Sequence, residues 1–162
     1  MTFEEHFLAT AAAKLRQLEG RIEVCLGKLS EEQIWARGGA NENAVGNLML
    51  HLAGNVRQWI VAGLGGAADI RERDAEFATV RGMSGAELTA RLRAQVEEAA
   101  GVIEKLPHGK LLVVHEIQNR QATGLEALFQ VVEHFGQHTG QIIYATKNLT
   151  GEDLGLVMPR KK

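Results

Sequence analysis

Four stretches of the chain repeat apolar residues at steps of three and four, the spacing that places them on one face of an α-helix. The first stretch predicts an amphipathic helix of about seven turns. Its apolar positions are Phe7, Ala11, Leu15, Leu18, Ile22, Leu26 and Leu29. Cys25 lies beside this face, so we expect it to pack as a small hydrophobic residue. The pattern Ser30-Glu31-Glu32-Gln33 predicts a short additional turn from Glu31 to Arg37.

The second stretch predicts a helix from about residue 43 or 44 to Leu64, ended by Gly65-Gly66. Its apolar positions are Val45, Leu48, Leu52, Val56, Trp59 and Gly63. Beside them runs a second line of positions: Asn47, His51, Asn55 and Gln58. A helix face open to solvent normally carries Lys or Glu, and this line carries neither. It therefore predicts the lining of a partly buried polar pocket, with a plain solvent-facing stripe as the alternative.

Two capping boxes open the third and fourth predicted helices, Ser84-Gly85-Ala86-Glu87 and Thr123-Gly124-Leu125-Glu126. The third helix ends before Pro107, and the fourth ends at about Leu149, with Gly151 behind it. The expected core positions of the third helix are Leu88, Leu92, Val96, Ala99, Ile103 and Leu106. Those of the fourth are Ala127, Val131, His134, His138, Ile142 and Ala145.

These helices predict an all-α protein, a four-helix bundle that forms a single domain over residues 1–162. Residues 65–82, between the second and third helices, show no long apolar period. At about 3.3 Å per residue they can return along a helix of roughly 30 Å, so that the second and third helices run parallel. Residues 110–122 predict an extended connector with a short strand at 111–114.

His134 and His138 are four residues apart, so on a helix both imidazoles lie on one face, one turn apart. Burying two neighbouring imidazoles costs free energy unless each ring nitrogen finds a partner, which a metal ion or hydrogen bonds from other helices would supply. In a bundle, His51 can face this pair. Three neutral imidazoles suit Zn²⁺, Ni²⁺ or Fe²⁺ and leave coordination positions open for water or substrate.

Other sites fit the sequence less well. The stretch from Glu133 to His138 is not the His-Glu-x-x-His motif of zinc proteases, because Phe135 takes the place of the catalytic glutamate. A di-iron centre would need two Glu-x-x-His motifs and further core glutamates. His108 and His115 lie in or beside a connector and are expected at the surface.

Composition narrows the class further. The net charge is −2 with acids and bases interleaved, which argues against a nucleic-acid surface, and only Arg160-Lys161-Lys162 is a basic run. No run approaches the about 18 apolar residues of a membrane span, and the N-terminus lacks the pattern of a signal peptide. One cysteine allows no internal disulfide, so a cytoplasmic location is predicted.

The chain resembles the DinB-like superfamily, which includes the bacillithiol transferases, and within it the DUF1572 branch. The resemblance lies in residues 46–60, 63–66, 132–142 and 151–155, together with Arg71, Arg73, Asp74, Glu76 and Phe77. It implies a metal triad of His51, His134 and His138, an up-down-down-up bundle and frequent homodimers. The characterised relatives are thiol S-transferases or thiol-dependent isomerases, and many members have no known activity.

The triad and the resemblance together predict an enzyme that uses a divalent metal to transfer a low-molecular-weight thiol to small electrophilic substrates. The residues expected to orient the thiol are Asn47, Asn55, Gln58 and Gln141, and those expected to bind a carboxylate on it are Arg57, Arg71 or Arg73. One alternative is a metal-binding stress or sensor protein without turnover. Another is a metal-dependent hydrolase, which the lack of an evident general base weakens.

Overall fold

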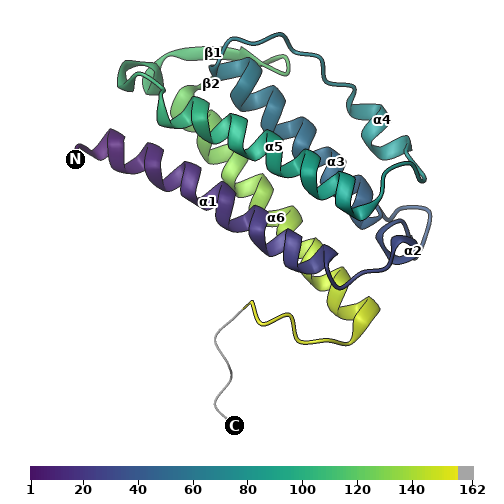
Figure 1. Cartoon of the computed structure of the whole chain (residues 1–162). Coiled ribbons are helices and arrows are strands. Elements are labelled where there is room, and N and C mark those ends of the chain that lie inside the picture. Colours follow the sequence, from purple (N-terminus) through teal and green to yellow (C-terminus); the bar gives the residue numbers. More distant parts are fainter. Residues whose placement is uncertain (157–162) are drawn as a thin grey trace.

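The computed structural model describes residues 1–156, so the basic run Arg160-Lys161-Lys162 lies outside the described residues. Four long helical stretches dominate it (Figure 1): α1 (Phe3–Leu26), α3 (Val45–Val56) with its π-helical continuation η1 (Arg57–Leu64), α5 (Gly85–Glu104) and α6 (Gly124–Thr150). The prediction of an all-α protein is confirmed. Both α1 and α3 pack against α5 and α6. In Figure 1, α1 and α6 run in one direction, and α3 and α5 run in the other.

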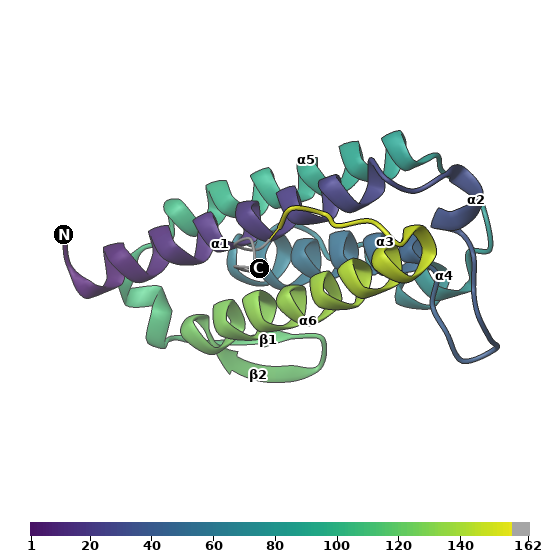
Figure 2. The same ribbon diagram turned by 90° about the horizontal axis from the view of Figure 1, so that it is seen from below.

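Five shorter elements join the long helices: α2 (Glu31–Ile34), α4 (Arg73–Ala78), η2 (His108–Leu112), β1 (Val114–Ile117) and β2 (Arg120–Thr123). The two views agree that the β1–β2 hairpin lies near one end of the molecule and that α2 and α4 lie at the other (Figures 1 and 2). Helix α4 was not predicted, because six residues are too few for a periodic pattern to emerge.

The predicted strand at 111–114 is wrong in place and in number. Residues 108–112 form a 3₁₀ turn that buries Leu111, and two antiparallel strands follow, with Val114 opposite Thr123 and Ile117 opposite Arg120. Gln118 and Asn119 connect them with φ of 54° and 59°. Two residues with positive φ match the twist of a tight hairpin, but without a glycine the turn is hard to recognise in the sequence.

The predicted helix ends are confirmed where a cap marks them. Ser84 and Thr123 each accept a hydrogen bond from the amide of the glutamate three residues on. Gly151 ends α6 with φ of +70°, a conformation that glycine adopts without strain. Helix α1 begins at Phe3, before the first position of its predicted apolar face, because Thr2 and Glu5 form a capping box that apolar periodicity does not reveal.

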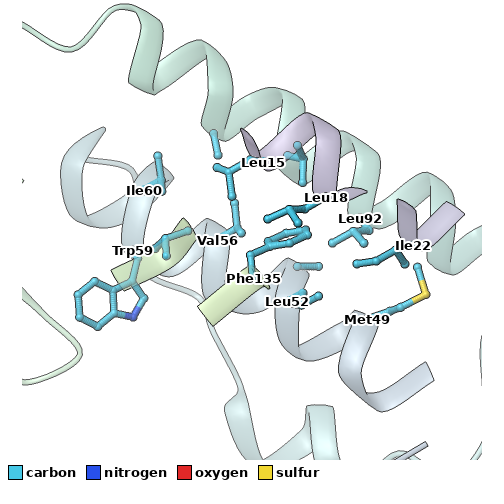
Figure 3. Packing of buried hydrophobic residues seen from close by; sticks show 14 of the residues in the cluster. Leu15, Leu18, Ile22, Met49, Leu52, Val56, Trp59, Ile60, Leu92 and Phe135 are labelled. Atoms are coloured by element: carbon cyan, nitrogen blue, oxygen red, sulfur yellow. The ribbon is translucent and has the colours of Figure 1, made fainter. Parts of the chain in front are cut away.

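Phe135 of α6 lies at the centre of the core, among side chains from α1, α3 and α5 (Figure 3). The prediction that His134, His138 and Ala145 belong to the buried face of α6 is wrong, since all three are half-buried. The residues of this stretch that are buried are Val131, Phe135, Thr139, Ile142 and Thr146. One residue further along an α-helix turns the side chain by about 100°, so the two histidines flank the core.

Helix α3 is covered on nearly all sides, and every residue from Val45 to Ala53 is buried. The reason is the connector between η1 and α5, which returns along the bundle to α4 (Figure 1) and packs α4 against α3. The polar line on α3 is therefore enclosed, as predicted. Within residues 1–156, no helix combines the length and the apolar character that crossing a membrane requires.

A buried charge on α1 gives a pH-dependent stability. Burial raises the pKa of Glu19, against the opposing effect of Arg93, whose Nε lies 3.7 Å from its Oε1. A raised folded-state pKa contributes stability at low pH that is lost as the pH rises through it. We expect Glu19→Gln to raise Tm at pH 7 by up to about 3 °C, and the gain to shrink towards pH 4. Exposed Glu116→Gln should shift Tm at neither pH in thermal melts. A Glu19→Gln gain that grows on acidification would contradict this assignment.

Candidate metal centre

Three histidines meet between α3 and α6. His51 lies in the second turn of α3, and His134 and His138 lie on consecutive turns near the middle of α6. The Nε2 atom of His134 is 3.1 Å from Nε2 of His51 and 3.1 Å from Nε2 of His138. One ligand atom from each ring lies within 4.8 Å of the other two. His51 of α3 thus faces His134 and His138 of α6, as the sequence analysis expected.

The outer nitrogens of two rings have partners that fix the tautomer. Nδ1 of His138 lies 2.7 Å from the amide oxygen of Gln141, and Nδ1 of His51 lies 3.0 Å from a carboxylate oxygen of Glu76. Both oxygens can only accept, so both Nδ1 atoms donate. Nη2 of Arg71, which can only donate, also lies 3.1 Å from Nδ1 of His51. Because it already donates to Glu76 at 2.8 Å and the carboxylate is the nearer partner of Nδ1, we place the ring proton of His51 on Nδ1. In a neutral ring this leaves a lone pair on Nε2. Nδ1 of His134 is buried and has no hydrogen-bond partner among the described residues.

Burial keeps the histidines of α6 neutral. It lowers the pKa of His134 to about 4, helped by the nearby His138, His51, Arg71 and Arg73. Burial also lowers the pKa of His138, although the hydrogen bond with Gln141 opposes the shift. A ligating imidazole must be neutral, so these rings are in the protonation state that a metal requires at neutral pH.

The geometry fits a bound cation. Two nitrogens that are each about 2.0–2.1 Å from a tetrahedral ion lie about 3.3 Å apart, close to the two 3.1 Å separations here. The Nε2 lone pairs of His51 and His138 both point towards His134, whose ring can offer at most one proton on that side. A cation could accept all three nitrogens, and three protein ligands would leave at least one coordination position for another molecule.

Sequence reasoning missed how the connector completes this site. Glu76 of α4 accepts from His51 and also pairs with Arg71, whose Nε and Nη2 lie 2.8 Å from its two oxygens. Burial raises the pKa of Glu76, but the hydrogen bonds and charges of Arg71 and His51 outweigh it and lower the pKa below its usual value. The ring of Phe77 packs against His51 at a centroid distance of 4.7 Å.

One feature of the sequence, not used in the prediction, could have pointed to this contact. Gly54 sits inside α3, one turn after His51, where glycine weakens a helix. A Cβ built there would lie 1.9 Å from Oε1 of Glu76. The glycine therefore marks the place where the carboxylate approaches the helix backbone, although the sequence alone does not say what approaches.

Three of the polar residues expected to orient a substrate have partners within the chain. Asn47 donates to the carbonyl oxygens of Glu76 and Thr79, and its own oxygen accepts from Arg37 and from the amide of Ala44. Gln58 accepts from Arg71 and donates to Asp69. Gln141 accepts from His138. These contacts give the three residues supporting roles, and binding of substrate by them stays a prediction.

The three candidate arginines differ in the partners that their guanidinium groups have within the chain. Arg71 is committed to Glu76 and Gln58, and Arg57 donates to the carbonyl of Ala68. Arg57 also lines a cavity of about 460 Å³ whose lining includes none of the three histidines. Arg73 lies over the ring of Phe77 at 5.0 Å and forms no ion pair with the described residues.

Asn55, one turn after His51, is buried, and its Oδ1 has no hydrogen-bond partner in the described part of the chain. Of the seven residues expected to bind substrate, Arg73 thus has no ion pair among the described residues, and Asn55 has a buried side-chain oxygen with no partner there. His108 is exposed as expected, whereas His115 is half-buried.

Comparisons with known proteins agree with this architecture. Two crystal structures are similar: a conserved protein from Enterococcus faecalis (TM-score 0.75, 18% identity, 88% of this chain and 96% of that one), and the DinB-like protein YjoA from Bacillus subtilis (TM-score 0.68, 14% identity, 89% and 93%). At these identities the likeness concerns the fold. No curated protein sequence matches the chain. The family model described as "Protein of unknown function (DUF1572)" matches residues 2–162. The chain therefore belongs to the DUF1572 family and has a DinB-like fold.

Proposed function

We propose that this protein binds one divalent metal ion through His51, His134 and His138 and uses it to transfer a low-molecular-weight thiol to small electrophilic molecules. The observation that carries the proposal is the convergence of three Nε2 atoms with two tautomers already fixed. A metal held by three imidazoles supplies Lewis acidity, which lowers the pKa of a thiol or water that reaches it. The soft and borderline ions Zn²⁺, Ni²⁺ and Fe²⁺ suit such ligands.

The proposed reaction consists of one substitution. The thiol loses its proton to solvent, the sulfur lone pair forms a bond to the electrophilic carbon, and the leaving group departs with the electron pair of its own bond. The chain would orient the thiol and exclude water. Phe77 and the buried side of α3 supply apolar surroundings next to His51. Asn55 has a free acceptor for an N–H or O–H group of the thiol molecule.

Arg73 is the best placed of the three arginines to recognise an anionic group on the thiol. It lies over the ring of Phe77, which itself packs against His51, and its charge adds to the lowering of the pKa of His134. Stacking on Phe77 holds it there by a cation–π contact. Because Arg71 is paired with Glu76, and Arg57 lines a cavity whose lining includes none of the three histidines, we assign recognition of a thiol carboxylate to Arg73.

Hydrolysis is less well supported. It would need a general base for the attacking water, and the carboxylate that contacts the triad, Glu76, has both oxygens engaged by Arg71 and His51. A metal-binding protein without turnover would share the triad, and the thiol assays below distinguish it from a transferase.

The triad is tested by metal content. We expect His134→Ala and His138→Ala each to retain below about a tenth of the wild-type metal after dialysis, because each change removes one of three ligands. His108→Ala removes an exposed histidine and should leave the content unchanged. Elemental analysis by mass spectrometry gives the measurement, and wild-type metal content in either α6 variant would show the triad to be wrongly assigned.

The thiol is tested by consumption assays with 1-chloro-2,4-dinitrobenzene as the electrophile. With mercaptosuccinate, which carries two carboxylates, we expect Arg73→Ala to raise KM about tenfold, the equivalent of about 1.4 kcal/mol. With uncharged 2-mercaptoethanol KM should not change. Arg81→Ala, an exposed arginine of the same connector, is the matched control. Full metal content without turnover of either thiol would replace the transferase by a non-catalytic metal-binding protein.

A further inference from the structure

Helix α4 is held to the bundle in an unusual way. None of its residues, Arg73 to Ala78, is buried, so it lacks the apolar anchor that normally docks a surface helix. It nevertheless packs on α3 and covers the side of the helix that carries His51. Polar contacts and one aromatic ring must therefore supply most of its attachment.

The strongest of these contacts is formed by Glu76. Its side chain is 10% exposed, that of Arg71 is 4% exposed and that of His51 is 7% exposed. The two 2.8 Å contacts with Arg71 form a bidentate, charge-assisted pair, the arrangement with the highest directional specificity among ion pairs. The second oxygen of the pair also accepts from Nδ1 of His51. One carboxylate thus connects the connector to the histidine triad.

The backbone of α4 is fixed by two further side chains. Asn47, which is fully buried, donates to the carbonyl oxygens of Glu76 and Thr79 at 2.9 and 2.7 Å. Arg37 donates to those of Phe77 and Thr79 and to Oδ1 of Asn47. These hydrogen bonds fix the position and rotation of α4 on α3. They therefore also fix where the Glu76 carboxylate lies.

The surface of α3 is shaped to receive that carboxylate. Gly54 leaves the backbone bare where Oε1 of Glu76 packs, and any Cβ at this position would overlap the oxygen at 1.9 Å and crowd Nε of Arg71 at 3.1 Å. A glycine within a helix costs about 0.5–1 kcal/mol relative to alanine. The contact with Glu76 explains why glycine occupies this helical position despite its lower helix stability.

We infer that Glu76 is a positioning residue for the metal ligand His51, and that docking of α4 and binding of metal are coupled through this one carboxylate. The inference rests on the metal centre proposed above. A carboxylate on the outer nitrogen holds the ring in the ligating tautomer and makes the inner nitrogen a stronger donor to a metal. A metal on Nε2 in turn makes Nδ1–H a better hydrogen-bond donor to Glu76. Coupling of two binding events is reciprocal, so the two effects are equal in size.

The first measurement is the affinity for Co²⁺. The metal-free protein is titrated with Co²⁺, and binding is monitored by the absorption spectrum of the bound ion. We expect Glu76→Gln to weaken binding about 10–100-fold, the usual cost of losing an outer partner of a metal ligand. Gly54→Ala keeps both charges but displaces the carboxylate, and should weaken binding in the same range. The matched controls are Asp74→Asn on exposed α4 surface and Gly101→Ala, whose Cβ meets nothing within 4 Å.

The second measurement is hydrogen exchange of the amides of residues 75–79 in the full chain. Saturating Co²⁺ should slow their exchange in the wild type by a factor similar to the affinity lost in Glu76→Gln, and should have little effect on them in either site variant. If Glu76→Gln does not fold, both measurements are made on Gly54→Ala, since this variant keeps both charges of the Glu76–Arg71 pair in the chain.

Two results would overturn the inference: Co²⁺ affinities of both site variants within about threefold of the wild type, or metal-induced protection of residues 75–79 that is equal in the wild type and the variants. A wild type that binds no Co²⁺ would overturn it together with the metal centre. Absence of thiol transfer leaves both readouts unaffected, so failure of the proposed reaction is distinguishable from failure of the coupling.

Discussion

The parallel direction of α3 and α5 is the constraint on which the rest of this structure depends. Two neighbouring helices that run the same way cannot be joined by a short loop, so the chain between η1 and α5 must return along the bundle. That return brings residues 66–84 over the outer face of α3. It explains why α3 is buried on nearly all sides and why a line of amides and one histidine can occur there without Lys or Glu.

The same return creates the chemistry of the site. A bundle of four helices alone would place His51 opposite the two histidines of α6, with its outer nitrogen facing solvent. The connector instead supplies an anion, Glu76, that is itself held by the buried guanidinium of Arg71. A buried ion pair contributes little net stability once its desolvation is counted, so its value here lies in fixing one ring in one tautomer.

The polar residues of the site fall into two groups, according to whether their polar atoms already have hydrogen-bond partners within the chain. Asn47, Gln58 and Gln141 satisfy other parts of the chain and hold α4, Arg71 and His138 in place. Arg73 stacks on Phe77, the ring beside His51, and Asn55 has a side-chain oxygen without a partner among the described residues, one turn further along α3. The two related crystal structures share the fold at 14% and 18% identity, a level at which such local arrangements are free to differ. The proposed function therefore rests on the geometry of this chain.

The sequence by itself determined the features that local physics decides. Apolar periods located the four long helices, capping boxes at Ser84 and Thr123 placed two of their starts within a residue, and Gly151 marked an end. The four-residue spacing put His134 and His138 on one face, and the enclosed polar line on α3 singled out His51 as their partner. In each case the signal is a repeat or a cap, in which residues a few positions apart act through a known helix geometry.

Tertiary structure alone decided what the connector does. Glu76 is one acid among several in a charged stretch, and no periodic pattern or cap there distinguishes it from Glu72 or Asp74. Its role arises because α4 is anchored by Asn47, 29 residues away, and because the backbone at Gly54 leaves room for it. The face of α6 was also misjudged, since Phe135 and not the histidines fills the core. Periodicity finds an apolar face to within about one residue's rotation, and only packing against the other helices fixes which side chains that face buries.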